Sequence, residues 1–148
     1  MVNIVFLIDD DEDDREIFRD AIRICNSQIE VLFARDGVEA LELLRSSWVR
    51  PEIIFLDYNM PRMNGVECLK QLKASQDLNE IPVVMYTTSG DRGQENAILE
   101  MGADYYMRKT HSFEQLCTEL ARLLDDIAKN HPKVVVRRRD SGSDRDRR

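Results

Sequence analysis

The side chains of this chain that are best suited to chemistry stand where short apolar runs end. Asp9 and Asp10 follow one run, Asp57 ends another, and Thr87 and Lys109 end two more. A buried carboxylate without a partner is costly, so acids placed there are expected to serve a ligand rather than the fold. If the runs are parallel strands, all five side chains meet at the same edge of one sheet, where open α/β sheets bind their ligands.

Three carboxylates gathered at one edge predict a cation. Asp9, Asp10 and Asp57 would repel one another, and carboxylate oxygens with water suit Mg²⁺ better than a soft metal. Bound there, Mg²⁺ would neutralise the charge of an incoming phosphoryl group, with Lys109 as a second positive charge and the Thr87 hydroxyl as a hydrogen-bond donor. A carboxylate can then attack phosphorus to give an aspartyl-phosphate.

Five apolar runs are predicted to be the strands that position these residues. The runs contain little polar alternation, which is typical of strands buried on both faces of a parallel sheet. Segments of helical period separate them, so the chain is predicted to be an α/β protein with a doubly wound parallel sheet. The expected strands are residues 3–8, 29–34, 53–57, 81–87 and 104–108.

The intervening helices carry start signals and apolar stripes. Capping boxes are expected for Asp36 with Glu39, Asn64 with Glu67 and Ser112 with Gln115. The acids of residues 11–14 are interpreted as charges of a helix N-terminus, where the helix dipole favours them. The strongest stripe belongs to the last helix and is expected to bury Phe113, Leu116, Cys117, Leu120, Leu123, Leu124 and Ile127.

Composition limits the classes of protein that the chain can belong to. Its 148 residues suit one domain, and the net charge of −7 hides a basic tail. Residues 131–148 hold seven basic and three acidic side chains, which gives +4 and leaves −11 for residues 1–130. We therefore expect a domain over 1–130, a disordered tail over 131–148, and no binding to nucleic acid. No run of about 20 apolar residues, signal peptide or disulfide pattern is recognised, so we expect a cytoplasmic protein away from membranes.

Residues 1–129 resemble the receiver domain of two-component response regulators. The segments that carry the resemblance are F-L-I-D-D-D, I-I-F-L-D-Y-N-M-P-R-M-N-G, I-P-V-V-M-Y-T-T-S and G-A-D-Y-Y-M-R-K, and the second is the most specific. The resemblance implies a flavodoxin-like (βα)5 fold with strand order 2-1-3-4-5. It also implies a phosphoprotein that is a regulatory phosphoacceptor and not an enzyme in its own right.

The same resemblance implies a role for each matching residue. Asp57 would accept the phosphoryl group from the phosphohistidine of a histidine kinase. Asp10 would ligate Mg²⁺ directly, Asp9 through water, and Asn59 through its main-chain carbonyl. The remaining roles fall to residues near the phosphoryl group: Thr87 and Lys109 would hold it, Thr87 and Tyr106 would form the switch, and Asn59 and Ser89 would set its lifetime.

The sequence of the fourth predicted strand, I-P-V-V-M-Y-T-T-S, is similar to that of stand-alone receivers that are paired with phytochrome-type or hybrid histidine kinases. This narrower resemblance is less specific. With no effector domain recognised, output is expected through a downstream protein, onward phosphotransfer or a homodimer. One residue departs from the family pattern, because Thr110 stands where receivers usually have a proline in a cis peptide after the lysine. Either the Lys109–Thr110 peptide bond is cis without a proline, or it is trans and the Lys109 side chain is oriented differently from the family pattern.

Two other functions remain open at the level of sequence. A Mg²⁺-dependent phosphatase could use Asp9 as its aspartyl nucleophile, with Asp11 two residues on. Such enzymes require Thr or Val soon after the second aspartate, where this chain has Asp13, and they require room for a cap. A receiver-like scaffold that no longer needs phosphate is the other alternative, and Thr110 is its only support.

Overall fold

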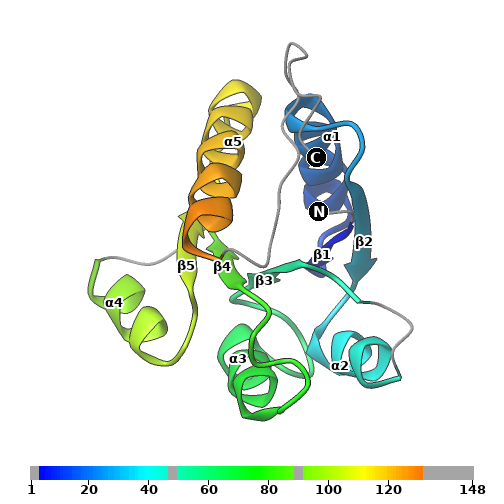
Figure 1. Cartoon of the computed structure of the whole chain (residues 1–148), viewed down its shortest axis with the longest axis vertical. Helices are drawn as coiled ribbons and strands as arrows, with labels where there is room; N and C mark the ends of the chain where they lie inside the picture. The colour runs from blue at the N-terminus through cyan, green and yellow to red at the C-terminus, as the bar shows by residue number, and fades with distance from the viewer. Residues whose placement is uncertain (1–3, 47–49, 89–91, 132–148) are drawn as a thin grey trace.

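Five parallel strands form one sheet in the order β2-β1-β3-β4-β5. The computed structural model describes residues 4–46, 50–88 and 92–131. This arrangement confirms the predicted flavodoxin-like fold, with β3 at the centre of the sheet (Figure 1). The strands are β1 (Ile4–Ile8), β2 (Glu30–Ala34), β3 (Ile53–Asp57), β4 (Val83–Thr87) and β5 (Tyr105–Arg108).

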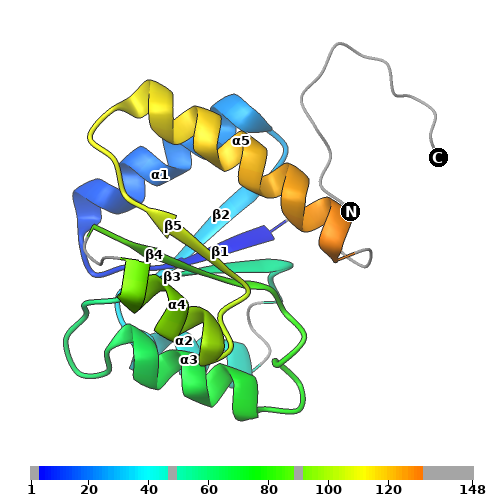
Figure 2. The same ribbon diagram turned by 90° about the vertical axis from the view of Figure 1, so that its left-hand side faces the viewer.

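Helices cover both faces of the sheet, as crossover connections between parallel strands require. In Figures 1 and 2, α1 and α5 lie on one face, while α2, α3 and α4 lie on the other. Within the described ranges, no helix is both long and apolar enough to cross a bilayer. The helices are α1 (Glu12–Cys25), α2 (Gly37–Arg45), α3 (Gly65–Ala74), α4 (Arg92–Glu100) and α5 (Phe113–Asn130).

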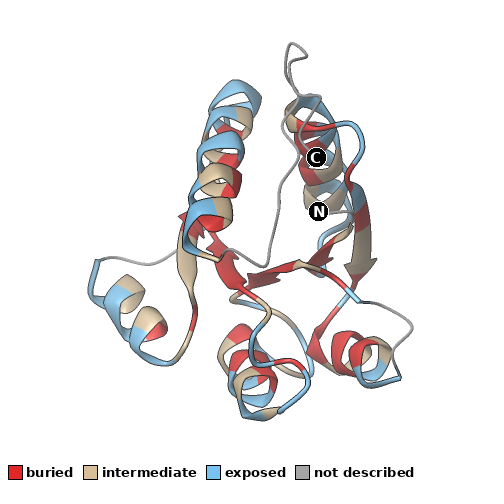
Figure 3. Ribbon diagram, in the orientation of Figure 1, coloured by how far each residue is buried: buried red, intermediate tan, exposed pale blue. Residues whose placement is uncertain are grey.

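Alternation along the strands divides the core into two clusters. In β3, Ile53 and Phe55 pack with α1 and α5, whereas Ile54 and Leu56 pack with the helices of the other face. All four side chains are fully buried. In Figure 3 the central strands of the sheet are red, whereas the edge strands β2 and β5 are partly tan. Asp57 follows in phase with Ile53 and Phe55, so its side chain is directed toward the face of α1 and α5.

The helix ends follow local signals in the sequence. Asn64 and Glu67 form the predicted reciprocal capping box, with each side chain accepting the other residue's backbone N–H at 2.9 and 3.0 Å. Asp36 accepts the Glu39 N–H at 2.9 Å, but the Glu39 carboxylate receives the N–H of Arg35 rather than that of the cap. These caps fix the starts of α2 and α3, and Gly65, the first residue of α3, lies against the Asp57 carbonyl.

The predicted apolar stripe of α5 is wrong at its start. Phe113 is 42% exposed, and Cys117 and Leu123 are only partly buried. The fully packed stripe begins one turn later, at Leu116, so the first turn of α5 lies outside the core. Helical period alone could not show this, because it does not reveal where a helix first meets the sheet.

Candidate functional site

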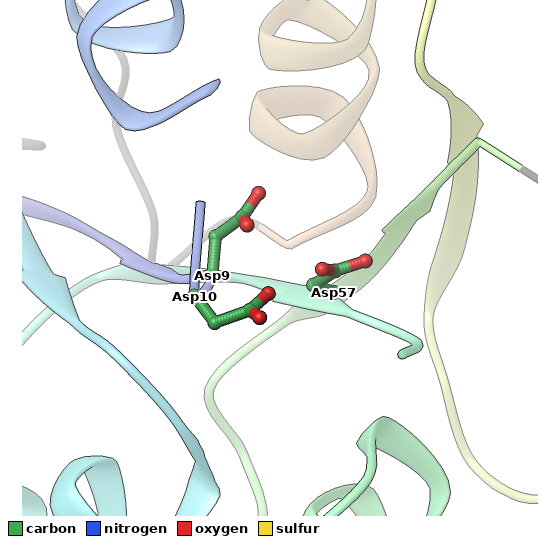
Figure 4. A group of neighbouring side chains, drawn as sticks. All are labelled: Asp9, Asp10 and Asp57. Carbon is green, nitrogen blue, oxygen red and sulfur yellow. The ribbon is translucent and has the colours of Figure 1, made fainter. Parts of the chain in front are cut away.

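Three carboxylates meet where β1 and β3 end. Each of Asp9, Asp10 and Asp57 offers an oxygen, and these oxygens all lie within 4.8 Å of one another. Figure 4 shows the three side chains together at this edge of the sheet. Asp9 is completely buried and Asp57 is 7% exposed, whereas Asp10 is open to solvent. Their convergence follows from register, because β1 and β3 pair in parallel and Ile8 lies beside Leu56.

Lys109 brings a positive charge to this cluster from the loop after β5. Its Nζ lies 2.8 Å from Asp9 Oδ2, 2.9 Å from Asp14 Oδ2 and 3.8 Å from Asp57 Oδ2. The lysine side chain is only 9% exposed. One ammonium therefore faces three carboxylates, and in this arrangement its two hydrogen bonds go to Asp9 and Asp14 rather than to Asp57.

The charges of the cluster change one another's protonation. Burial raises the pKa of Asp57 to about 7, and Asp9 and Asp10 add to the rise although the Lys109 charge opposes it. Burial also raises the pKa of Asp9, against the hydrogen bond from Lys109. The pKa of Lys109 is raised as well, because the hydrogen bonds to Asp9 and Asp14 outweigh the effect of its burial. The site carries more negative charge than one lysine balances.

An all-oxygen donor set with excess negative charge fits a hard divalent cation. Asp9, Asp10 and Asp57 supply that set, and none of the three free cysteines contributes to it. A cation bound there would lower the pKa of Asp57 and so favour the ionised form that a nucleophile requires.

Thr87 and Tyr86 end β4 beside the cluster. Thr87 is 1% exposed, and its carbonyl accepts the Lys109 N–H at 2.8 Å, which anchors the backbone of the lysine. The Lys109 ammonium lies 5.1 Å from the centre of the Tyr86 ring. Tyr86 in turn packs against Phe18 and Phe55 with ring centres 5.6 and 6.2 Å away. A cation–π contact thus joins the lysine to the core, a role for Tyr86 that strand periodicity did not reveal.

The chain between β3 and α3 folds closely around Asp57. The backbone N–H of the exposed Asn59 lies near the Asp57 carboxylate and acts to lower its pKa, against the effect of burial. At Gly65, a Cβ would clash with the Asp57 carbonyl and would lie 2.8 Å from Tyr58 Cα. Only glycine allows α3 to begin this close to the end of β3.

The other residues predicted for the site are placed as follows. Tyr106 is partly buried and packs against the cluster that contains Ile98 of α4 and Ala103. Ser89 lies outside the described residues. The described peptide bonds are all trans, including the one between Lys109 and Thr110. The Lys109–Thr110 turn therefore has the trans conformation, and in it the Lys109 side chain still reaches the carboxylates of Asp9 and Asp57.

Asp14 is the residue of the site that sequence reasoning missed. The sequence pattern predicts only a charge of the helix N-terminus at this position, yet the Asp14 carboxylate lies 2.9 Å from Lys109 Nζ. Asp11 is the residue that caps α1, because its side chain accepts the N–H groups of Asp13 and Asp14. The sequence signal for Asp14 is weak, since it is the last of six consecutive acids, residues 9–14, and the run gives no indication of which later acid turns toward the sheet.

Asp14→Asn is expected to lower the free energy of unfolding by about 0.5–1 kcal/mol in Mg²⁺-free buffer. The loss is small because the Asp14 side chain is 35% exposed and Lys109 retains Asp9. Chemical denaturation measures it, with Asp13→Asn as the control because Asp13 is an exposed acid in the same helical turn. Equal effects of the two substitutions would show that the Lys109–Asp14 pair contributes nothing.

Comparison of the sequence with known proteins finds response regulators both among family models and among individual relatives. The family model for the response regulator receiver domain matches residues 5–121. The polar-differentiation response regulator DivK of Brucella anthropi is 32% identical over 126 residues, covering 85% of this chain and 99% of DivK. Response regulator MprA of Mycobacterium ulcerans is 34% identical over 120 residues, covering 81% of this chain and 49% of MprA. The chain thus spans about half the length of the MprA proteins that it matches.

Solved structures with the same fold include regulators that are named for phytochromes. The phosphorylated cyanobacterial phytochrome response regulator RcpA superposes with a TM-score of 0.77 at 26% identity, covering 89% of this chain and 96% of RcpA. The Mn²⁺-bound form of response regulator Rcp1 gives 0.75 at 25% identity, covering 91% and 99%. The bacteriophytochrome response regulator RtBRR gives 0.70 at 32% identity, covering 83% and 78%.

Proposed function

The chain belongs to the response regulator receiver family of two-component signalling, and from this we propose that Asp57 accepts a phosphoryl group from a histidine kinase. The observation that carries the proposal is the position of Asp57. It ends the central strand within 4.8 Å of the oxygens of Asp9 and Asp10 and 3.8 Å from Lys109 Nζ. A regulatory phosphoacceptor, rather than an enzyme that turns over a separate substrate, fits this arrangement.

In the transfer step, an Asp57 carboxylate oxygen attacks phosphorus. The phosphorus–nitrogen bond of the kinase phosphohistidine breaks, its electron pair stays on the imidazole nitrogen, and the product is an acyl phosphate on Asp57. Asp9, Asp10, Asp57 and the Asn59 main-chain carbonyl would hold Mg²⁺, which when bound supplies positive charge to the phosphoryl oxygens. The Mn²⁺-bound form of Rcp1 supports divalent metal binding at such a site.

Lys109 and Thr87 complete the charge and hydrogen-bond balance of the phosphorylated state. Lys109 would leave Asp14 for a phosphoryl oxygen, and the Thr87 hydroxyl would donate to another. Asn59 and Ser89 would influence how long the acyl phosphate survives. Asp57 suits the role of nucleophile better than Asp9, because the Asp9 side chain is fully buried and held by Lys109 at 2.8 Å.

Phosphorylation is proposed to act through a population shift between two packings. Movement of Thr87 toward the phosphoryl group would let Tyr106 turn inward. Tyr106 packs against the cluster that includes Ile98 of α4, so its movement would reshape the face formed by α4, β5 and α5. That face is the proposed binding surface for a downstream protein, a phosphotransfer partner or a second copy of the chain.

RcpA and RtBRR are described as phytochrome response regulators, which supports a phytochrome-type kinase as the phosphodonor. Hybrid kinases remain the other donor class that we propose. The free cysteines agree with a cytoplasmic location. We place the receiver domain within residues 1–130 and the basic tail within 131–148, of which the structure describes only His131.

Acetyl phosphate with Mg²⁺ tests the phosphoacceptor directly. Intact mass should increase by one phosphoryl group, and peptide mapping should place the label on Asp57. The label should be lost in Asp57→Asn and without Mg²⁺. Persistent labelling of the variant at another residue would overturn the assignment, and steady turnover of a generic phosphomonoester would favour a phosphatase.

A further inference from the structure

Arg62 has an unusual backbone conformation in the loop between β3 and α3. Its φ is 65°, and it is the only residue other than glycine with a positive φ in the described ranges. The Met63 N–H donates to the Pro61 carbonyl at 2.6 Å, which closes a γ-turn with Arg62 at its centre. A γ-turn with positive φ is rare and strained, so it persists only where its surroundings hold it.

The side chain of Arg62 provides one such restraint. Its Nε and Nη2 donate to the two carboxylate oxygens of Asp36 at 2.9 and 3.1 Å. Asp36 is 6% exposed and caps α2, where its Oδ1 also accepts the Glu39 N–H at 2.9 Å. A two-pronged bond between a guanidinium and a carboxylate fixes direction as well as distance, which a lysine cannot do equally well.

Met63, the residue after Arg62, also packs against the start of α2. A Cβ at Gly37, the first residue of α2, would lie 2.9 Å from Met63 Sδ and 3.2 Å from Cys68 Cβ. The absence of that Cβ is what admits the methionine against the core cluster of this face. The loop is thus tied to the start of α2 at two successive positions.

The other end of the loop returns to Asp57. The Gly65 N–H donates to the Tyr58 carbonyl at 2.8 Å, which closes the base of the loop. Asn59 lies in the chain between this base and the Arg62 turn, and its backbone N–H is near enough to the Asp57 carboxylate to lower its pKa. Only Met60 and Pro61 separate Asn59 from Arg62. A displacement of the turn at Arg62 is therefore expected to move the Asn59 main chain.

We propose that the Arg62–Asp36 pair is a positioning device that holds residues 58–64, and with them the Asn59 main chain, in register with Asp57. The proposal rests on the phosphoacceptor function, because it is the Asn59 carbonyl that is to face the cation. Neither partner is catalytic. Their effect reaches the site through the backbone of the loop, and α2 thereby becomes part of the support of the phosphorylation site.

Arg62→Met tests the pair, because it removes the guanidinium but retains an unbranched side chain. Amide hydrogen exchange of residues 58–64 should become faster in Mg²⁺-free protein, and calorimetry should show Mg²⁺ affinity about tenfold weaker. Labelling of Asp57 by acetyl phosphate should persist at saturating Mg²⁺. Arg62→Lys should fall between the wild type and Arg62→Met in both measurements.

Arg62→Gly separates positioning from strain. Glycine adopts the γ-turn without cost, so this variant should be more stable than Arg62→Met yet bind Mg²⁺ as weakly, because its loop is not tied to Asp36. Recovery of full Mg²⁺ affinity in Arg62→Gly would overturn the proposal by showing that only strain mattered.

Arg35→Met is the matched control. Arg35 pairs with Glu39 at the same helix start, is 73% exposed and has no contact with the loop among the bonds described. It should leave exchange and Mg²⁺ affinity unchanged. Unaltered exchange and affinity in Arg62→Met would refute the pair as a positioning device. Failure of wild-type protein to bind Mg²⁺ or to be labelled would instead refute the phosphoacceptor function, while hydrogen exchange of the loop would still test the restraint.

Discussion

Asp57→Asn is expected to raise the free energy of unfolding by about 1–3 kcal/mol at pH 8 in Mg²⁺-free buffer, although it removes the proposed phosphoacceptor. Burial raises the pKa of Asp57 from 3.8 to about 7, so the folded protein holds a proton that the unfolded chain releases near pH 4. Between these two values the folded state binds more protons, and wild-type stability falls as the pH rises. A neutral side chain of the same shape avoids that loss.

The pH dependence of the stability gained in Asp57→Asn tests whether the raised pKa of Asp57 causes it. The difference between Asp57→Asn and wild type should be small near pH 4, grow as the pH rises and level off above about pH 7. Millimolar Mg²⁺ should reduce it, because a bound cation stabilises the ionised wild type and not the variant. Chemical denaturation at several pH values measures it, with Asp77→Asn as the control at an exposed acid. Equal gains in the two variants, or a gain that does not depend on pH, would contradict the explanation.

Lys109→Met should have the opposite effect and lower the free energy of unfolding by about 2–4 kcal/mol at pH 8 without Mg²⁺. The substitution leaves Asp9, which is fully buried, without the ammonium that lies 2.8 Å from it. It also removes the positive charge 3.8 Å from Asp57. The folded-state pKa of each carboxylate would rise further, so the variant should lose stability more steeply than wild type as the pH increases.

Two comparisons make the Lys109→Met experiment informative. The loss should shrink near pH 5, where the carboxylates take up protons and need no counter-charge, and it should shrink when Mg²⁺ is added. Lys70→Met is the control, since Lys70 is an exposed lysine of α3. A loss that is the same at both pH values would mean that Lys109 contributes packing rather than charge.

The fold was predictable because each level of the sequence favours the same structure. The apolar run that ends at Asp57 is typical of a strand buried on both faces, and the Asn64–Glu67 pair predicts the start of the helix that follows. Phe113 could not be placed in the same way. Its burial depends on where the first turn of α5 lies relative to the sheet, which helical period does not encode.

The site was predictable to the extent that strand ends specify it. Asp9, Asp10, Asp57, Thr87 and Lys109 all end or follow strands, and parallel pairing brings them to one edge. The contacts of Asp14 and Tyr86 with Lys109 depend instead on how one lysine side chain turns, and those of Arg62 depend on a three-residue turn. Such contacts are set by tertiary packing and have no period in the sequence.

The hydrogen bond between Lys109 and Asp9 spans 100 positions of the chain, which has a consequence for synthesis. Translation delivers the acids of β1 and β3 well before the lysine that follows β5. Until that last strand docks, the nascent chain has neither the counter-charge nor the complete sheet edge of the site. If Asp57 is the phosphoacceptor as proposed, a chain in which β5 has not yet docked lacks the Lys109 ammonium beside Asp57 and is not expected to be phosphorylated as the complete domain is.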